Sequence, residues 1–289
     1  MNDSNRFNPI QNNDDIPVDL KEEKIEVEET KIDFPIVAVE LPSWGEVYPV
    51  NHPFYKKKNI EIKEMTAQEE DILTSKSLIK KGIVLDRLMK SILLDKVNPE
   101  KITIGDRNAI LLAARINGLG PEYSAKIVCP ACDTRSNFDY DLNKAVIKDY
   151  KEVLMYIESK DVELSIDSPG VFSLILPKTK ANIKFRLLTG EDEKYIQEVS
   201  KNNKNALINE ENFTLQLRRS IIEVNGKKDA ATLLKFTKTV PMLDTRFFKV
   251  VYTACSPDIV LKTKWECPSC GVTEEDIVVP YGTEFFWPK

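Results

Sequence analysis

Two Cys-x-x-Cys pairs constrain the fold of this chain more than any other feature of its sequence. Cys129 and Cys132 lie in "VCPACDTRSNFD", Cys267 and Cys270 lie in "WECPSCGVTEED", and 134 residues separate Cys132 from Cys267. A structural zinc ion needs four ligands in a tetrahedron, so one Cys-x-x-Cys turn supplies only half of a site. The two turns together predict one structural zinc centre with four thiolate ligands and no open position for water.

Both cysteine pairs lie between segments that predict β-strands. "EYSAKIVCPACDTRSNFDYDL" and "DIVLKTKWECPSCGVTEEDIVVPYG" each predict a strand, a turn and a second strand. Gly271 follows the second pair and suits left-handed backbone, which Asp133 adopts less readily at the equivalent position of the first. Joining the two hairpin tips gives a zinc-ribbon arrangement. Two separate pairs of buried or redox-active cysteines are the alternative, although thioredoxin-type chemistry needs the first cysteine to open a helix.

Helical patterns account for much of the remaining chain. Thr66 and Glu69 have the spacing of a capping box, which predicts a helix that starts at Ala67. A further helix is predicted from an N-cap at Asp106 to a stop at Gly118. More helices are predicted in "IVLDRLMKSILL", "EDEKYIQEVSK", "NFTLQLRRSIIEV" and "MLDTRFFKVVYTAC", and "VFSLILPKTKANIKFRLL" predicts a β-hairpin.

The predicted fold class is therefore α+β, with a zinc-ribbon-like pair of β-hairpins brought together around a mixed helical and β insertion. Residues 1–35 form an acidic leader, which we expect to be disordered in the free protein and, if it acts, to lie along a partner. Residues 36–144 hold the N-terminal helical region with the first zinc hairpin, and residues 145–254 hold the α+β insertion. Residues 255–289 hold the second zinc hairpin and an aromatic C-terminus.

Charge and composition limit the classes of partner. Lysine and arginine total 41 against 46 aspartates and glutamates, a net charge of −5, which gives no general attraction to nucleic acid or to an anionic membrane. The chain lacks an apolar run that could span a bilayer and lacks the pattern of a secretory signal. Five cysteines are too few for a disulfide scaffold, so we expect a soluble protein of a reducing, intracellular compartment.

The sequence offers no evident catalytic set, which predicts that the protein is not an enzyme. His52 is the only histidine and lies between turn residues, where a surface or loop role is expected. Phosphate-binding loops and a nucleophile elbow are missing. Ordinary structural roles are expected for the acids of 69–71 and 191–193 (capping and solvation), for Cys255 (a buried small side chain) and for Arg218 and Arg219 (a solvated helix face).

Seven segments, taken in order, resemble the baseplate hub assembly proteins of T-even-like contractile-tailed phages: "ELPSWGEVYP", "EMTAQEEDILTSKSLIKKGIVLDRLM", "IGDRNAILLAARI", "CPACD", "LLTGEDEKYI", "CPSCG" and "GTEFFWP". The resemblance runs from about residue 40 to residue 289. It implies a non-enzymatic component or chaperone of the baseplate hub that docks hub or wedge proteins. It implies no small-molecule substrate and no membrane, and a place in the host cytoplasm during assembly or in the virion tail.

The aromatic C-terminus is the predicted partner-binding site. In an extended strand successive side chains point to opposite faces, so Phe285, Phe286 and Trp287 cannot all enter one core. One reading places Phe285 and Trp287 in the core and Phe286 on a surface patch. The other has at least one of the three dock on a partner protein.

A nucleic-acid-binding zinc ribbon is the rival function. Such ribbons often read nucleic acid with basic and aromatic side chains near the cysteine turns, and Lys262, Lys264 and Trp265 lie beside the second turn. Three acidic residues follow in "GVTEEDIVV" and oppose a phosphate backbone. This reading predicts binding that weakens steeply with salt.

Overall fold

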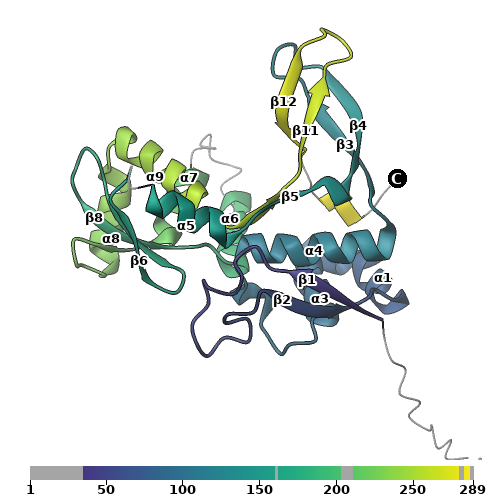
Figure 1. Cartoon of the computed structure of the whole chain (residues 1–289), viewed down its shortest axis with the longest axis horizontal. Helices are drawn as coiled ribbons and strands as arrows, with labels where there is room; N and C mark the ends of the chain where they lie inside the picture. The colour runs from purple at the N-terminus through teal and green to yellow at the C-terminus, as the bar shows by residue number, and fades with distance from the viewer. Residues whose placement is uncertain (1–34, 160–161, 203–210, 280–282, 287–289) are drawn as a thin grey trace, which may run out of the picture. The chain divides into compact units, whose positions relative to one another are not determined.

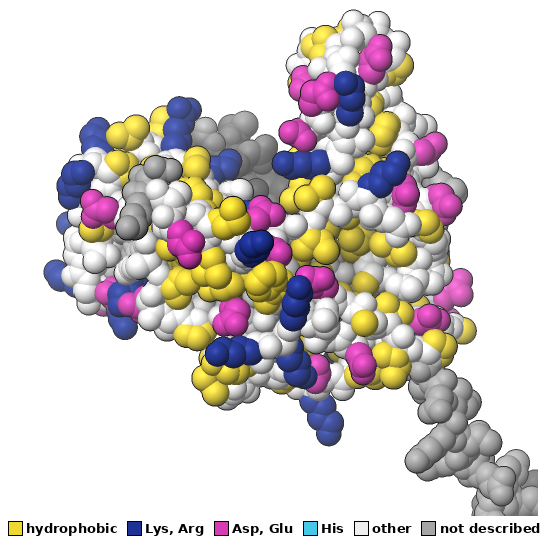
Figure 2. Space-filling view, viewed as in Figure 1, with side chains coloured by type: hydrophobic (Ala, Val, Ile, Leu, Met, Phe, Trp, Pro, Cys, Tyr) yellow, Lys and Arg dark blue, Asp and Glu magenta, His cyan; other side chains and the backbone are white. Residues whose placement is uncertain are grey.

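The computed structural model describes residues 35–159, 162–202, 211–279 and 283–286, all within the compact unit Phe34–Lys289. The predictions for the leader and for Trp287 lie outside the described residues and stay predictions. The described part is a mixture of helices and small antiparallel sheets (Figure 1), so the predicted α+β class is confirmed. Charged side chains of both signs are interspersed with apolar ones over the face seen in Figure 2. Among the described helices, none is long and apolar enough to cross a membrane.

The first part of the unit is a two-stranded sheet packed with helices. Its elements are β1 (Ile36–Glu40), β2 (Asn59–Lys63), α1 (Ala67–Thr74), α2 (Lys76–Lys81), α3 (Val84–Ile92), η1 (Pro99–Lys101) and α4 (Ile104–Leu119). The capping box of Thr66 and Glu69 is present and starts α1 as predicted. Gly82 adopts left-handed backbone, with φ of 71°, and ends α2.

The predicted ends of α4 are wrong at both termini. The N-cap is Thr103 and not Asp106, and the helix runs through Gly118 to end before Gly120, whose φ is 84°. Asp106 is fully buried in the first turn, where it accepts hydrogen bonds from the hydroxyls of Ser43 and Tyr48, each at 2.6 Å. The carboxylate also accepts a hydrogen bond from the hydroxyl of the N-cap Thr103 at 3.2 Å, so it lies in the first turn and joins a distant loop to the helix start.

Two glycines of α4 allow a matched test of its packing. Replacing glycine by alanine inside a helix stabilises it by about 1 kcal/mol where space allows. At Gly105 an added Cβ would lie 2.0 Å from the backbone oxygen of Pro257, whereas at Gly118 it would meet only the side chain of Met65, whose terminal methyl would lie 2.2 Å away. A side-chain end can rotate away, but a backbone carbonyl in a packed core cannot.

We therefore expect Gly105→Ala to lower the free energy of unfolding by about 2 kcal/mol or more, because the clash must be relieved by moving the backbone. Gly118→Ala should stay within about 1 kcal/mol of the unaltered chain. Urea denaturation of both variants measures the difference. Equal effects at the two positions would contradict the close approach of α4 to Pro257.

The second part of the unit is a four-stranded antiparallel sheet with helices around it. Its elements are α5 (Tyr150–Glu158), β6 (Leu164–Ser168), β7 (Val171–Ile175), β8 (Asn182–Arg186), α6 (Gly190–Asn202), α7 (Glu211–Ser220), β9 (Ile221–Val224), α8 (Ala230–Thr239) and α9 (Met242–Cys255). The strand order is β6-β7-β8-β9, and β7 and β8 form the predicted hairpin. Phe172 stacks on Phe185, and the ring of Phe248 from α9 meets Phe185 edge-on at 5.3 Å.

The two cysteine hairpins are the remaining part. Their elements are β3 (Glu122–Val128), β4 (Arg135–Asp141), η2 (Leu142–Lys144), β5 (Val146–Lys148), β10 (Asp258–Val260), β11 (Lys262–Glu266), β12 (Thr273–Val278) and η4 (Thr283–Phe286). β3 pairs with β4 and β11 pairs with β12, as predicted. β5 pairs with β10, with Ile147 opposite Ile259. Because β5 follows the first hairpin and β10 precedes the second, this pairing brings the two hairpins together, as Figure 1 shows.

Candidate metal centre

The two cysteine turns have the same backbone conformation. In the first, Cys129 N–H donates to the carbonyl of Thr134 at 2.9 Å, and Asp133 N–H donates to the carbonyl of Cys129 at 3.0 Å. In the second, the same two bonds join Cys267 to Val272 at 2.8 Å and Gly271 to Cys267 at 3.0 Å. Asp133 and Gly271 have φ of 55° and 69°, so the left-handed backbone predicted at both positions is confirmed.

The four cysteine sulfurs form one cluster. All four lie within 4.8 Å of one another, and the cross-hairpin pairs Cys129–Cys270 and Cys132–Cys267 are each 3.7 Å apart. A tetrahedral ion with sulfurs at about 2.3 Å has an edge of about 3.8 Å between sulfurs, so the spacing fits one shared metal ion. The alternative of two separate cysteine pairs does not fit this geometry, and the cluster could hold a metal ion.

The hairpins present one apolar face beneath the cluster. Along β3, Tyr123, Ala125 and Ile127 are buried while the alternate residues are exposed. The hydroxyl of Tyr140 in β4 donates to the carbonyl of Lys262 in β11 at 3.3 Å. Of the four cysteines, the first of each pair is buried and the second is exposed. The metal would therefore lie at the edge of a small core and join the two hairpins at their tips.

The pKa values of Cys132 and Cys270 shift in opposite directions. A hydrogen bond with Thr134 lowers the pKa of Cys132 to about 6. A hydrogen bond from Val272 N–H also favours the thiolate of Cys270, but the neighbouring sulfur of Cys132 opposes it, and the pKa of Cys270 rises to about 12. Four thiolates at this spacing repel one another in the absence of a cation. A divalent metal ion removes that conflict, because a coordinating thiol is deprotonated outright.

The residues proposed for nucleic-acid contact do not form a binding face. Trp265 is buried, with 4% of its surface exposed, so its ring has no free face on which a base could stack. Lys264 is paired with Glu275 across the hairpin at 2.6 Å. Lys262 alone of the three is exposed without an ion pair to a described residue.

The described C-terminal residues form a turn of 3-10 helix instead of a strand. Both Phe285 and Phe286 are buried, each with 5% of its surface exposed, and their rings meet edge-on at 5.3 Å. The reading that places Phe286 on a surface patch is wrong, because side chains do not alternate in a 3-10 helix as they do in a strand. Partner binding by this segment stays a prediction, and Trp287 lies outside the described residues.

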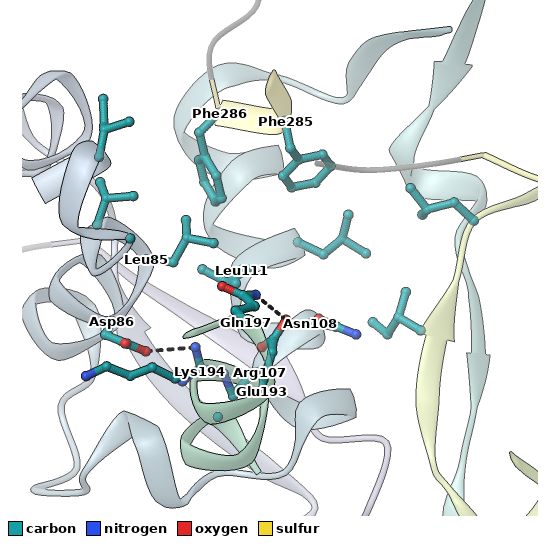
Figure 3. Close-up of a pocket in the computed structure, with 17 residues that line it drawn as sticks. Leu85, Asp86, Arg107, Asn108, Leu111, Glu193, Lys194, Gln197, Phe285 and Phe286 are labelled. Atoms are coloured by element: carbon teal, nitrogen blue, oxygen red, sulfur yellow. Dashed lines mark hydrogen bonds and ion pairs between the residues drawn. The ribbon is translucent and has the colours of Figure 1, made fainter. Parts of the chain in front are cut away.

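Phe285 and Phe286 line a cavity of about 490 Å³ between α3, α4, α6 and the C-terminal turn (Figure 3). Leu85 and Leu111 face it from α3 and α4. Three of its charged lining residues are engaged in pairs: Arg107 donates to Asp86 at 2.8 Å, and Lys194 to Glu100, outside the lining, at 3.0 Å. The fourth, Glu193, accepts a hydrogen bond from Gln197 at 3.4 Å. The described lining therefore offers an apolar surface together with one carboxylate, Glu193.

A buried arginine, which the sequence analysis missed, anchors the C-terminal turn. Arg115 has 1% of its surface exposed and donates from Nε to the carbonyl of Phe285 at 2.8 Å. Its two other nitrogens donate to the carbonyls of Gly120 and Glu122. The burial of Arg115 could have been predicted from its position, because it falls on the same face of α4 as Leu111 and Leu112.

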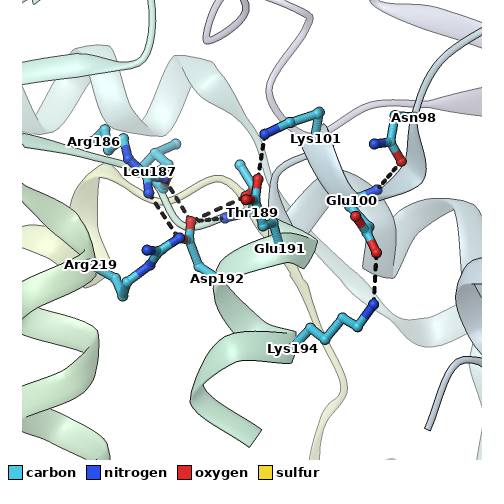
Figure 4. Close-up of polar contacts among 10 residues, drawn as sticks. All are labelled: Asn98, Glu100, Lys101, Arg186, Leu187, Thr189, Glu191, Asp192, Lys194 and Arg219. Atoms are coloured by element: carbon cyan, nitrogen blue, oxygen red, sulfur yellow. Dashed lines mark hydrogen bonds and ion pairs between the residues drawn. The ribbon is translucent and has the colours of Figure 1, made fainter. Parts of the chain in front are cut away.

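Buried acids with cationic partners form two further clusters. Asp192 is fully buried and accepts a two-pronged pair from Arg186, at 2.7 and 2.8 Å, and a bond from Arg219 at 2.6 Å (Figure 4). Glu69 is likewise buried and pairs with Lys63 at 2.7 Å. The predicted solvation is therefore wrong for Asp192 and Glu69, and Arg219 is not simply a solvated residue.

The protonation of Asp192 gives a test of its cluster. Burial raises the pKa of this carboxyl, but the hydrogen bonds from Arg186, Thr189 and Arg219 outweigh burial and hold it at about 2, below the ordinary 3.8. A lowered pKa contributes stability above the unfolded value, and this contribution is lost as the pH falls through the folded value. We expect a loss of about 2 kcal/mol from this group between about pH 5 and about pH 2.

The matched variant is Asp192→Asn, which should be less stable at neutral pH by about 3 kcal/mol because two partly buried guanidinium groups lose a fully buried anionic partner. It also lacks the titrating carboxyl. The difference in unfolding free energy between the two proteins should therefore shrink as the pH falls, as followed by urea denaturation at each pH. A difference that stayed constant would show that Asp192 has an ordinary pKa.

His52 and Cys255 were each assigned a structural role. The His52 ring stacks on Tyr48 at 4.2 Å between centroids and accepts a hydrogen bond from Phe54 N–H at 3.1 Å. Burial lowers the pKa of His52, so the ring is a half-buried neutral packing group in its loop. Cys255 is fully buried, as predicted, and burial raises the pKa of its thiol to about 12.

Comparison with known proteins gives one family. The family model described as T4 bacteriophage base plate protein matches residues 34–287. Neither a curated protein nor a solved structure matches the chain.

Proposed function

Because this chain belongs to the T4 bacteriophage base plate protein family, we propose that it is a non-enzymatic structural or assembly component of a phage tail baseplate, acting at the hub. The observation that carries this proposal is the extent of the match, residues 34–287, which spans almost all of the compact unit Phe34–Lys289. Membership of a baseplate family implies contact with other baseplate proteins. We propose hub or wedge proteins as these partners, met during assembly in the host cytoplasm.

The metal proposed for the cluster is one structural zinc ion held by Cys129, Cys132, Cys267 and Cys270. Four soft thiolates in a tetrahedron suit zinc, and a set of four protein ligands leaves no place for a reacting water. The matching turns and the sulfur spacing of 3.7 Å support this assignment. In this proposal the two hairpins form a zinc-ribbon-like unit whose metal fixes the ends of a long insertion.

Co-expression of the full chain with the other baseplate proteins of its phage tests the proposed function. We expect a stable complex with at least one hub or wedge protein on size-exclusion chromatography, and none with an unrelated phage capsid protein as the control. Failure to bind any baseplate protein would overturn the proposal.

Mass spectrometry of purified virions then separates the two forms of the proposal. A structural component should be present in the particle, whereas an assembly factor should be absent although its deletion blocks baseplate formation. A protein absent from virions whose deletion leaves baseplates intact would have neither role.

A further inference from the structure

Helix α9 has an outer face that the described residues leave exposed. Met242, Leu243 and Val250 have 68%, 58% and 63% of their surfaces exposed, and Arg246 and Lys249 are exposed between them. At about 100° per residue these five positions fall within an arc of about 120°. We call these five residues the α9 patch.

The inner face of α9 explains why this outer face is held rigidly. Phe248, Val251 and Cys255 on the opposite side are buried in the core. Asp244 at the first turn of α9 accepts hydrogen bonds from the backbone N–H groups of Lys178 and Thr179, at 2.8 and 3.0 Å. The patch is therefore presented by a well-anchored helix, and its three large aliphatic side chains are exposed without a local packing role.

The segment that carries the patch is basic. Residues 227–253 contain six lysines and arginines and two aspartates, on a chain whose net charge is −5. Of the two acids, Asp244 is buried and Asp229 caps α8 through Thr232 N–H. Figure 2 shows dark blue side chains gathered over the region of α8 and α9.

Five exposed cations lie on α9, on α8 and in the loop that Asp244 contacts. On the neighbouring α8, Lys235 and Lys238 are exposed, and Lys178 lies beside the start of α9 through the contacts of Asp244. Arg246 and Lys249 complete the set within the patch. None of these five cations forms an ion pair with another described residue.

An apolar centre with a charged rim is the usual anatomy of a protein interface, in which a few buried anchors supply affinity and rim charges supply orientation. We propose that the α9 patch docks an acidic segment of a neighbouring baseplate protein, with aliphatic anchors that pack on Met242, Leu243 and Val250. That the partner is a baseplate protein rests on the proposed function.

A protein partner fits the patch better than a nucleic acid. Sites for single-stranded nucleic acid stack bases on exposed aromatic rings, but the aromatic residues of α9, Phe247, Phe248 and Tyr252, all lie off its exposed face. Duplex sites need mainly cations, and three exposed aliphatic side chains would gain nothing from a phosphate backbone. The observed mixture of aliphatic and basic groups matches an acidic peptide surface.

Two double variants test the patch in the co-expressed full chain. Leu243→Ser with Val250→Ser removes the anchors, and Arg246→Glu with Lys249→Glu reverses the rim charge. We expect each to weaken the complex by at least about tenfold, and the charge variant to abolish the decline of affinity with added salt. All four side chains are exposed, so thermal unfolding should remain as in the unaltered chain.

Matched controls lie elsewhere on the surface. Ile36→Ser with Val50→Ser changes two aliphatic side chains that are 56% and 75% exposed, and Lys80→Glu with Lys81→Glu reverses two exposed charges on α2. Both control pairs should bind as the unaltered chain does, which separates a specific patch from general effects of surface charge.

The outcomes distinguish the patch from the proposed function. If the unaltered chain binds no baseplate protein, the proposed function fails, and the patch proposal fails with it. If it binds and both patch variants bind equally well, only the patch proposal is overturned. If the patch variants keep the protein complex but lose binding to a duplex DNA oligonucleotide, the patch is a nucleic-acid site and the proposal is wrong.

Discussion

Replacing Cys267 by serine is expected to remove the metal and separate the hairpin β11–β12 from the hairpin β3–β4. A structural zinc ion contributes an apparent 10 kcal/mol or more at neutral pH, roughly as much as the whole stability of a typical domain. We therefore expect the thermal midpoint to fall by about 10 °C or more. Limited proteolysis should cut the variant within the cysteine hairpins, where the unaltered chain resists cleavage.

The chain provides its own control in Cys255, which is buried outside the cluster. Cys255→Ala should keep the metal and lose only about 1 kcal/mol of stability, since it removes one buried sulfur. Elemental analysis of the unaltered chain, purified under reducing conditions, should find one zinc per chain. Protein without metal, or a Cys267→Ser variant as stable as Cys255→Ala, would refute the zinc centre.

Chelation gives the same test without a mutation. A strong chelator should make the unaltered chain protease-sensitive, and added zinc should restore its resistance because the thiolate ligands remain in place. Cobalt substitution should give thiolate-to-metal charge-transfer absorption, which reports sulfur ligation directly. Cys267→Ser should lose most of that absorption, whereas Cys255→Ala should retain it.

The parts of the fold that the sequence predicted correctly are those whose contacts are local. Each cysteine turn is closed by hydrogen bonds between residues four and five positions apart, so the pattern around Cys129 specifies the turn by itself. The capping box joins Thr66 to Glu69, three positions apart. The strands beside the turns show the alternation that a half-buried hairpin requires. The pairing of the two turns could be predicted because one structural metal ion takes four ligands and each turn supplies two.

The parts that were wrong depend on residues far apart in the chain. Asp106 looks like an N-cap until Ser43, 63 positions away, is found to donate to it. Asp192 has the pattern of a solvated acid at a helix start. In the fold, Arg219, 27 positions later in the chain, pairs with its carboxylate. In both cases the local pattern correctly placed an acidic residue near a helix start. The burial that decides its role comes from tertiary packing, which short-range spacing does not encode.

The C-terminal turn shows the same limit for apolar residues. "GTEFFWPK" gives no period long enough to separate a strand from a turn of 3-10 helix, and the two place Phe286 on opposite sides. Its true environment is set by Arg115, 170 positions earlier in the chain. The burial of Phe286 therefore could be predicted only together with the burial of that arginine.

Replacing Arg115 by methionine is expected to lower the free energy of unfolding by about 3 to 5 kcal/mol. Methionine keeps much of the side-chain length but cannot donate to the buried carbonyl of Phe285 or to the part-buried carbonyls of Gly120 and Glu122. Because one of these bonds anchors the C-terminal turn, that turn should also become an early site of proteolysis. Urea denaturation and carboxypeptidase digestion measure the two effects.

Arg87→Met is the matched control, since Arg87 is exposed on α3 and its loss should change stability by no more than about 0.5 kcal/mol. Arg115→Lys separates charge from geometry, because lysine keeps the cation but cannot present the planar fork that reaches three carbonyls. We expect this variant to be nearly as unstable as Arg115→Met. If lysine restored full stability, charge alone would hold the turn, and if Arg115→Met matched Arg87→Met, the anchoring role of Arg115 would be wrong.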